Sequence, residues 1–421
     1  MKRFYHIGMS WLTSWQILYL LTAAMSVGIF YARSLVSITT GSFLAIGVLA
    51  LLDRTHRSGL WQRREIRYLM GIFLIYVVSV MVSTDHSKWL SQLNIGLPYL
   101  GIPLGLAAFY PVTRKMLTHL ICIYIGATLI SAGVIVVDYA GHWQEYNRMY
   151  KFGQTIPTPI LHVWYSYFVA LACCLGAGLL LDGAVPQRIL RRGLLAATVG
   201  LFVVLHLLAV RTGLFACYGG LMTVVVVHAM RNRRWRQVFA MVALILVVFT
   251  AGYWLLPSMR NKIDYMRYDL RMLVEHGALP EYSDNTRVVS YQHGLRVFAE
   301  HPVFGAGIGD VTSEIASIYL QDTPQFPADR RYLPESDYIY WLATFGLVGT
   351  VILLALVLYP LGLFWRQSYL MVALYAVTLI SSLGVTTLQL QLGKTAFLVL
   401  LCIVLQYCRS QVVAEPVITP G

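Results

Sequence analysis

Residues 338–361 read YIYWLATFGLVGTVILLALVLYPL, a stretch without any Asp, Glu, Lys or Arg. A helix needs about 20 apolar residues to cross a bilayer, so this stretch predicts a transmembrane helix. In lipid every backbone polar group must be paired within the protein, and a continuous apolar run achieves this as a helix. Similar runs lie at 14–31, 35–52, 68–84, 96–110, 116–138, 161–182, 193–210, 212–230, 237–256, 368–388 and 393–408. The sequence therefore predicts an all-α membrane protein with about twelve transmembrane helices.

Two of these runs are atypical. The run at 96–110 holds Pro98 and Pro103, so we expect its helix to be broken or tilted. The run at 14–31 follows the basic start Met1-Lys2-Arg3 and imitates a signal peptide. It is long and no clear small-residue cleavage site follows it, which favours a retained first helix.

The composition supports a membrane protein and argues against nucleic-acid binding. Of the 421 residues, 58% are hydrophobic and 12% are charged, whereas a soluble domain carries roughly 25% charge. The net charge is +13, but the basic residues form short runs between apolar blocks, as they do in the cytoplasmic loops of membrane proteins. The six cysteines lie inside or beside apolar blocks without metal-ligand spacing and read as small hydrophobes. We expect no metal and no cofactor.

The distribution of Lys and Arg predicts the orientation. Short loops on the side of the N-terminus hold 18 of these residues, and the opposite short loops hold six, Lys394 among them. Because cytoplasmic loops carry the excess of positive charge, both termini are expected in the cytoplasm. The expected division is transmembrane helices one to nine in 1–256, an extracytoplasmic loop domain in 257–334, helices ten to twelve in 335–410, and a cytoplasmic tail in 411–421.

The long loop has the pattern of a small helical domain. A first helix is predicted at 258–276, and a second is predicted to begin at Ser283-Asp284-Asn285, whose side-chain oxygens would cap it, and to stop at Pro302. A tight turn at 305–309 and a short third helix at 310–320 follow, and the glycines of the turn allow positive φ. The expected apolar faces consist of Ile263, Met266, Leu270 and Leu273 in the first helix, and Val288, Tyr291, Leu295 and Phe298 in the second.

The candidates for chemistry gather at the outer surface. Ionisable residues well inside the apolar runs are nearly absent, which argues against a proton-coupled transporter. The outer candidates are Arg148, His162, Arg211, Arg287, Arg296, His301, Asp310, Glu335 and Asp337. A reaction is therefore expected at the outer membrane–water boundary, on a substrate that arrives in the bilayer.

Three arginines are candidates for binding a phosphate. Arg211 lies between two apolar runs with almost no loop, where it is either an interfacial anchor or a planar cationic donor for a phosphate. Arg287 falls in the first turn of a predicted helix, where free N–H groups also favour an anion. Arg296 is nine residues further on and is expected to point in a similar direction; the alternative for both is a solvated helix face. A sharper hypothesis pairs Arg211 with Arg287 over one pyrophosphate.

The carboxylates and histidines also have two interpretations each. Glu335 and Asp337 precede the tenth apolar run and are either helix caps or general bases for an acceptor hydroxyl. His162 and His301 are either packing residues at helix ends or substrate-binding residues, a role also open to Arg148 and Arg296. The GAGIG turn follows a helix rather than a strand, so it is not a dinucleotide site.

The order of these features resembles the O-antigen ligase family, which also contains O-antigen polymerases and protein O-oligosaccharyltransferases. The resemblance runs from about residue 157 onward and includes the long loop between the ninth and tenth helices. Its motifs are Val210-Arg211-Thr212-Gly213, RVVSYQHGLRVFAEHPVFGAGIGD at 287–310 and ESDYIYWLATFGLVG at 335–349.

The resemblance implies a glycosyltransferase of the Gram-negative inner membrane. It implies a donor glycan carried on undecaprenyl pyrophosphate at the periplasmic face and displacement of that lipid by a hydroxyl of the lipid A-core. It also implies that Arg211 and Arg287 hold the pyrophosphate. Ligases of the family usually carry a catalytic His-Asn pair at the position of Glu335-Ser336, so Glu335, Asp337 or positioning alone must serve here. The alternatives are a polymerase that joins lipid-linked repeat units and, from another class, a lipid-linked sugar flippase.

Overall fold

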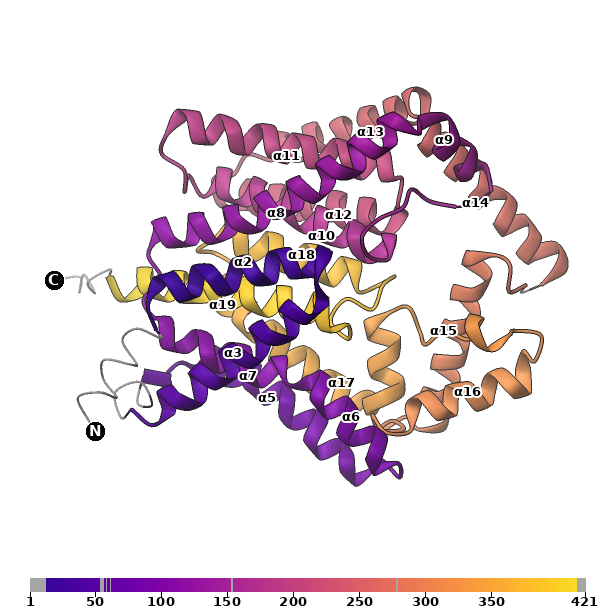
Figure 1. Ribbon diagram of the computed structural model, residues 1–421, viewed down its shortest axis with the longest axis horizontal. Coiled ribbons are helices and arrows are strands. Elements are labelled where there is room, and N and C mark those ends of the chain that lie inside the picture. The colour runs from indigo at the N-terminus through magenta and orange to yellow at the C-terminus, as the bar shows by residue number, and fades with distance from the viewer. Residues whose placement is uncertain are drawn as a thin grey trace.

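The computed structural model describes residues 13–53, 57, 59–60, 62–152, 154–277 and 279–414, and every regular element in them is a helix (Figure 1). The prediction of an all-α protein is confirmed. In this part of the chain, nine helical segments are long and apolar enough to cross a membrane. The total of about twelve stays a prediction, because the helices found in three of the apolar runs are shorter than 18 residues. Residues 1–3 and most of the expected tail 411–421 lie outside the described residues.

The first part of the bundle contains the proline-containing run. Its helices are α2 (Trp15–Tyr31), α3 (Arg33–Leu51), α5 (Arg64–Val78), α6 (His86–Gly96), α7 (Pro98–Leu106) and α8 (Arg114–Gly141). Pro98 begins α7, where its missing N–H costs nothing because the first turn leaves that group unpaired. Residues 86–95, expected as a loop, form α6 instead. Only Leu97, whose backbone stays in the helical region, separates α6 from α7. The expectation that the fourth run is broken or tilted therefore stays a prediction.

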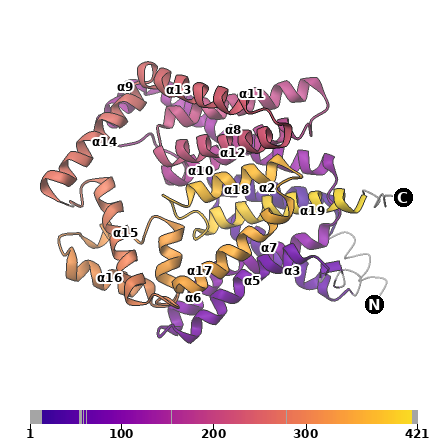
Figure 2. The same ribbon diagram turned by 180° about the vertical axis from the view of Figure 1, so that it is seen from behind.

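The remaining long helices surround a buried centre. They are α10 (His162–Leu181), α11 (Arg188–Leu208), α12 (Arg211–Asn232), α13 (Arg236–Leu255), α17 (Asp337–Phe364), α18 (Tyr369–Ser381) and α19 (Gln391–Ala414). Figure 2 shows α18 and α19 between the layer of α11 to α13 and the layer of α3, α5 and α7. Lys394, counted above with an outer loop, is buried in α19 and donates to the carbonyl of Ile95 (2.9 Å). Its assignment to a loop was wrong, because α19 begins before it.

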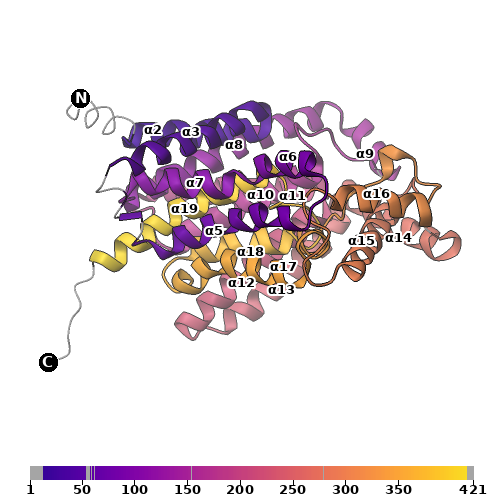
Figure 3. The same ribbon diagram turned by 90° about the horizontal axis from the view of Figure 1, so that it is seen from below.

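Residues 257–334, called the cap below, lie at one end of the bundle, and the start of α2 and the end of α19 lie at the other (Figures 1 and 3). The cap contains α14 (Pro257–His276), α15 (Ser283–Glu300) and α16 (Val311–Asp322), so its three predicted helices are confirmed. A short helix, α9 (Trp143–Lys151), lies beside α14. The side of the membrane that each end faces, and the division into domains, stay predictions.

The start of α15 is capped differently from the prediction. Tyr282 occupies the cap position, and the side chains of residues 283–285 do not cap the helix. Instead, the buried carboxylate of Asp269, on α14, accepts a hydrogen bond from the backbone N–H of Asp284 (3.1 Å). An anion at this place satisfies a free N–H and the helix dipole. The carboxylate of Asp284 is thereby available for another partner.

The predicted apolar faces of the cap helices were partly wrong. Leu270 on α14 is exposed, as is Leu295 on α15. The buried face of α15 is rotated by about one residue around the helix from the predicted face, and it carries Val289, His293 and Val297. Helix α15 packs against the first part of α17 rather than against lipid, so polar and small residues occupy part of its contact face.

Two glycines set the direction of α17. Gly346 (φ +61°) interrupts α17, and Gly305 (φ +72°) lies in the turn that follows α15. A Cβ atom on either glycine would lie 2.4 Å from backbone atoms of the other segment. The segments are joined by hydrogen bonds from Leu347 N to Pro302 O and from Ala306 N to Ala343 O (both 2.9 Å). The first part of α17 therefore lies beside α15, and Glu335, just before α17, reaches Arg287 in the first turns of α15.

Candidate functional site

Arg211 is held at the start of α12, at the end of the bundle where the cap lies, by a two-residue turn. The turn consists of Ala209, with a left-handed φ of +50°, and Val210. The hydroxyl of Tyr150 donates to the carbonyls of Leu207 and Leu208 (3.1 and 3.0 Å), which fixes the preceding end of α11. The guanidinium of Arg211 is consequently presented from a rigid helix start, as the missing loop in the sequence suggested.

The two arginines of the pyrophosphate hypothesis come together through a carboxylate. Both terminal nitrogens of Arg211 donate to Asp284 (2.9 and 2.5 Å). Asp284 and Arg287 are three residues apart on α15 and so are neighbours on its surface. Arg287 in turn binds Glu335, with Nε and a terminal nitrogen each 2.7 Å from Oε2. The side chains of Arg287 and Glu335 are 23% and 33% exposed, so the pair is accessible from outside.

Lys262 on α14 completes the group and was missed in the sequence. Its charge interacts with those of Arg211 and Arg287 and with those of Asp284 and Asp269. Burial, together with the repulsion from the two arginines, lowers the pKa of Lys262 to about 8. We call Arg211, Lys262 and Arg287 the cation cluster.

A signal for Lys262 exists in the sequence. Lys262 and Asp269 are seven residues apart, which places them on the same stripe of α14 as Met266. Charged residues on the apolar stripe of an amphipathic helix are typical of a partnered or functional position. Only the packing of α14 against α15 shows which partners they have.

His162 lies within electrostatic range of the cation cluster. It is the first residue of α10, and the charges of Lys262 and Arg287 act on its ring. The two cations disfavour a further positive charge on the imidazole. His162 therefore lies near the cation cluster on a different helix from any of the three cations, and its role in substrate binding stays a prediction.

Glu335 and Asp337 differ in what they can do. The backbone at Glu335 is fixed, because the Tyr291 hydroxyl donates to its carbonyl (3.2 Å), while its carboxylate faces Arg287. The carboxylate of Asp337 is fully buried and accepts hydrogen bonds from the Ser382 hydroxyl and the backbone N–H groups of residues 387–389 (2.7–3.0 Å). Asp337 therefore anchors the loop between α18 and α19 and is not placed to act as a general base.

Arg296 was wrongly expected to point in the direction of Arg287. Nine residues correspond to two and a half turns of an α-helix, so the two side chains leave opposite faces. Arg296 instead forms ion pairs with Glu300 (3.0 Å) and with Asp322 of α16. It joins α15 to α16 at the surface of the cap.

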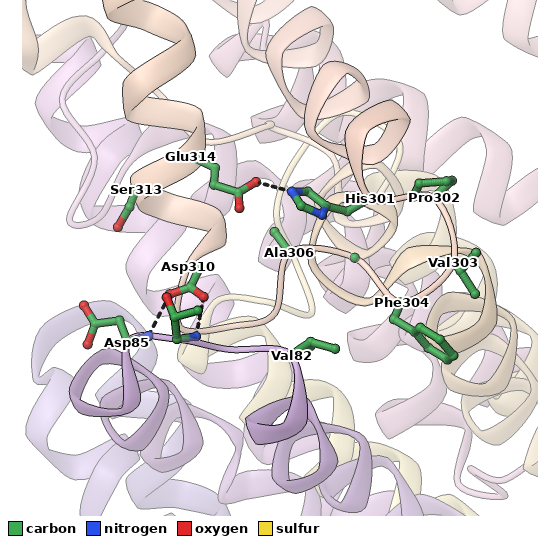
Figure 4. Close-up of a pocket in the computed structure, with 12 residues that line it drawn as sticks. Val82, Asp85, His301, Pro302, Val303, Phe304, Ala306, Asp310, Ser313 and Glu314 are labelled. Carbon is green, nitrogen blue, oxygen red and sulfur yellow. Dashed lines mark hydrogen bonds and ion pairs between the residues drawn. The ribbon is translucent and has the colours of Figure 1, made fainter.

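His301 lies in a separate cavity of about 760 Å³, shown in Figure 4. Its Nε2 is 3.1 Å from Glu314 Oε2. On the other wall, Asp310 accepts hydrogen bonds from the backbone N–H groups of Thr84 (2.5 Å) and Asp85 (2.9 Å). These bonds, with burial opposing them, leave the pKa of Asp310 below its usual value. His301 directly follows the end of α15, fourteen residues from Arg287 and roughly 20 Å away along the helix axis, so it does not belong to the cation cluster.

Arg148 lies elsewhere, and Gly213 serves packing. Arg148, on α9, is exposed and lines a different cavity, between α9 and α14. Gly213, in the first turn of α12, lets α10 come close: an added Cβ would lie 2.4 Å from the Ser166 Cβ. The glycine therefore serves helix packing beside the site.

The arrangement is suited to binding a doubly charged phosphate group. A guanidinium binds phosphate with the same two-pronged geometry with which it binds a carboxylate. The carboxylate of Asp284 binds Arg211, and that of Glu335 binds Arg287, in the way that phosphate oxygens would bind them. In the described residues no group of three or more His, Cys, Asp or Glu side chains has the arrangement of a metal site.

Comparison with known proteins identifies part of the chain. Residues 196–354 match the family model described as O-antigen ligase, and this range includes the cation cluster, Asp284 and Glu335. No curated protein matches the chain. Members of the matched family are glycosyltransferase-like ligases and polymerases that use lipid-linked glycans. Residues 196–354 of this multi-pass membrane protein are therefore a domain of the O-antigen ligase family.

Proposed function

We propose that the protein transfers a polysaccharide from undecaprenyl pyrophosphate to a sugar hydroxyl of the lipid A-core, at the periplasmic face of the Gram-negative inner membrane. The observation that carries this proposal is the meeting of Arg211, Lys262 and Arg287 from three helices at the end of the bundle where the cap lies. The pyrophosphate of a lipid donor lies at the membrane surface, so the proposal requires that this end of the bundle lie there.

The donor's pyrophosphate first replaces the two carboxylates. Its oxygens take the places of Asp284 on Arg211 and of Glu335 on Arg287, and Lys262 adds a third positive charge. The acceptor hydroxyl then attacks the anomeric carbon of the first sugar. The bond from that carbon to the pyrophosphate oxygen breaks, and the electron pair leaves with the lipid pyrophosphate, whose developing charge the cations stabilise.

Glu335 receives the proton of the acceptor hydroxyl. While it is bound to Arg287 its carboxylate is a poor base, because the guanidinium stabilises the charged form. Displacement by the donor frees it next to the reacting carbon. Donor binding and activation of the base are in this way one event, and Glu335 fills the position of the histidine found in ligases of the family.

The experiment that tests the function is transfer by purified protein in liposomes containing lipid-linked donor and lipid A-core acceptor. We expect glycan to appear on the acceptor without nucleotide or added energy source. Absence of transfer under conditions in which the protein is folded and binds the donor would exclude the ligase assignment.

A polymerase that joins lipid-linked repeat units is the second candidate, and the replacement of the family's His-Asn pair by Glu335-Ser336 favours it. A deletion strain separates the two. Loss of a ligase leaves long chains on the lipid carrier, whereas loss of a polymerase leaves single repeats on lipid A-core.

Lys262 makes donor binding dependent on pH. With a pKa of about 8 in the free protein, Lys262 is about nine-tenths protonated at pH 7 and about one-tenth at pH 9. The bound pyrophosphate favours the charged form and raises this pKa, so deprotonation opposes binding as pH rises. The donor dissociation constant is expected to increase about tenfold from pH 7 to pH 9. The Lys262→Arg variant, charged throughout, should lose this dependence; an equal dependence in both proteins would assign it to another group.

A further inference from the structure

Two cavities adjoin along the side of α14 that faces α9. One has a volume of about 850 Å³ and the other of about 610 Å³. They share four lining residues, which are Lys151, Phe152, Asn261 and Asp264. Because of these shared walls the two cavities are direct neighbours, and together we call them the α9–α14 groove. Figure 1 shows α9 and α14 side by side at the edge of the molecule.

Aromatic rings line the part of the groove that lies on the cap. The rings of Phe152 and Tyr268 are 68% and 48% exposed, and Tyr265 and Tyr282 complete this wall. Trp254, at the end of the spanning helix α13, fits an aromatic anchor at the membrane interface. The tyrosines do not fit that description, because they are carried by α14 and by the segment before α15, beyond the end of the spanning helix.

Amide and cationic side chains occupy the other part of the groove. The amides are Gln144, Asn147 and Asn261, and the cations are Arg148, Lys151 and Arg260. Within the described part of the chain these three cations form no ion pair, and the carboxylate lining both cavities is that of Asp264. The groove therefore carries an excess of positive charge that is available to a ligand.

The groove leads to the cation cluster. Asn261, Asp264, Tyr265 and Tyr268 share one face of α14, and Lys262 lies on the adjacent face. The Nζ atom of Lys262 is 5.7 Å from the centre of the Tyr265 ring. A chain that is attached to a pyrophosphate, or that approaches it, can thus continue from the cation cluster into the groove.

We propose that the α9–α14 groove binds an anionic oligosaccharide. Aromatic faces pack against the apolar faces of sugar rings, amides hydrogen-bond to hydroxyls, and Arg148 and Arg260 pair with phosphate or carboxylate substituents. The inference rests on the proposed function in one respect, namely that the saccharide is the transferred glycan or the acceptor. Either would gain binding energy here that is remote from the bond being broken.

The test measures saccharide binding without requiring transfer. Full-length protein in lipid nanodiscs is titrated by calorimetry with two probes from the source cells: core oligosaccharide freed of its acyl chains, and the glycan released from the lipid-linked donor. We expect one probe to bind, and its affinity to fall about tenfold in the Arg148→Gln/Arg260→Gln double variant. The Phe152→Ala variant is expected to lose a similar amount. Arg271→Gln is the matched control, because Arg271 is an exposed arginine on α14 that does not line the groove.

The outcomes distinguish the source of the ligand and separate this inference from the proposed function. Binding of the core oligosaccharide assigns the groove to the acceptor, and binding of the released glycan assigns it to the donor. The inference is overturned if neither probe binds, or if the double variant binds as the Arg271→Gln control does. If transfer occurs in liposomes but no saccharide binds, the proposed function is supported and the saccharide site is rejected. If a saccharide binds but no transfer occurs, the saccharide site is supported and the proposed function is rejected.

Discussion

Transfer of a lipid-linked glycan in liposomes is expected to fall by about 10²- to 10³-fold when Arg287 is replaced by alanine. Arg287 is the less exposed of the two arginines, and its guanidinium would face the pyrophosphate in surroundings that strengthen electrostatic interactions. Burial lowers its pKa, but the carboxylate of Glu335 outweighs burial and holds the pKa above its usual value. The side chain is therefore a permanent cation at the place where negative charge develops on the leaving group.

Arg287→Lys and Arg296→Ala give this prediction its controls. Lysine keeps the charge but not the two-pronged geometry, so Arg287→Lys is expected to recover only part of the activity. Arg296 lies on the same helix and forms its ion pairs with Glu300 and Asp322, so Arg296→Ala should transfer within about twofold of the unmodified protein. The site assignment fails if Arg287→Ala, folded and inserted in the bilayer, retains full activity. The corresponding loss for Arg211→Ala is expected to be smaller, since its side chain is 39% exposed.

The second large effect concerns the two carboxylates that occupy the arginines in the absence of donor. Asp284→Asn and Glu335→Gln each remove a negative charge that competes with the pyrophosphate, so both variants should bind the donor more tightly, by up to about tenfold. Their catalytic rates should differ. Glu335→Gln is expected to lower single-turnover transfer by about 10²-fold or more, because the proton acceptor is lost. Asp284→Asn should leave that rate near the unmodified value.

Donor affinity and single-turnover rate must be measured separately for this comparison, with saturating acceptor. Tighter binding combined with slower transfer in Glu335→Gln alone supports a base that the donor releases. If Glu335→Gln transfers as fast as Asp284→Asn does, Glu335 is only a counter-ion of Arg287. Another group must then accept the proton, and His162 is a candidate because the charges of Lys262 and Arg287 act on its ring.

Several features of the fold and the site follow from the sequence because they depend on local chemistry. Apolar runs near the thickness of a bilayer have only the helix open to them, which made the all-α class predictable. Pro98 occupies the first position of α7, where a helix tolerates proline. The short connection before Arg211 fixed the position of its guanidinium at a helix end.

Errors arose where contacts between distant segments compete with local patterns. The first residues of α15 were expected to cap their own helix. Instead, Asp269 on α14 accepts the hydrogen bond from the free N–H at the start of α15, and the carboxylate of Asp284 binds Arg211. Asp337 resembled a helix cap or a base, yet it holds a loop fifty residues away. The error on Arg296 was of a different kind. Two residues nine positions apart in an α-helix lie on opposite faces, so Arg296 could not point in the direction of Arg287.

By itself the sequence determined that the chain is a bundle of membrane-spanning helices with a helical cap, because hydrophobicity and helix periodicity act over a few consecutive residues. Only the tertiary structure decided that Arg211, Lys262 and Arg287 share one site and that Asp284 and Glu335 occupy it. The reason is physical: these side chains come from α12, α14, α15 and the segment before α17, and their meeting depends on how the helices pack. Glu335, for example, is held beside α15 by the bond from the Tyr291 hydroxyl to its carbonyl, a contact between residues 44 positions apart in the chain.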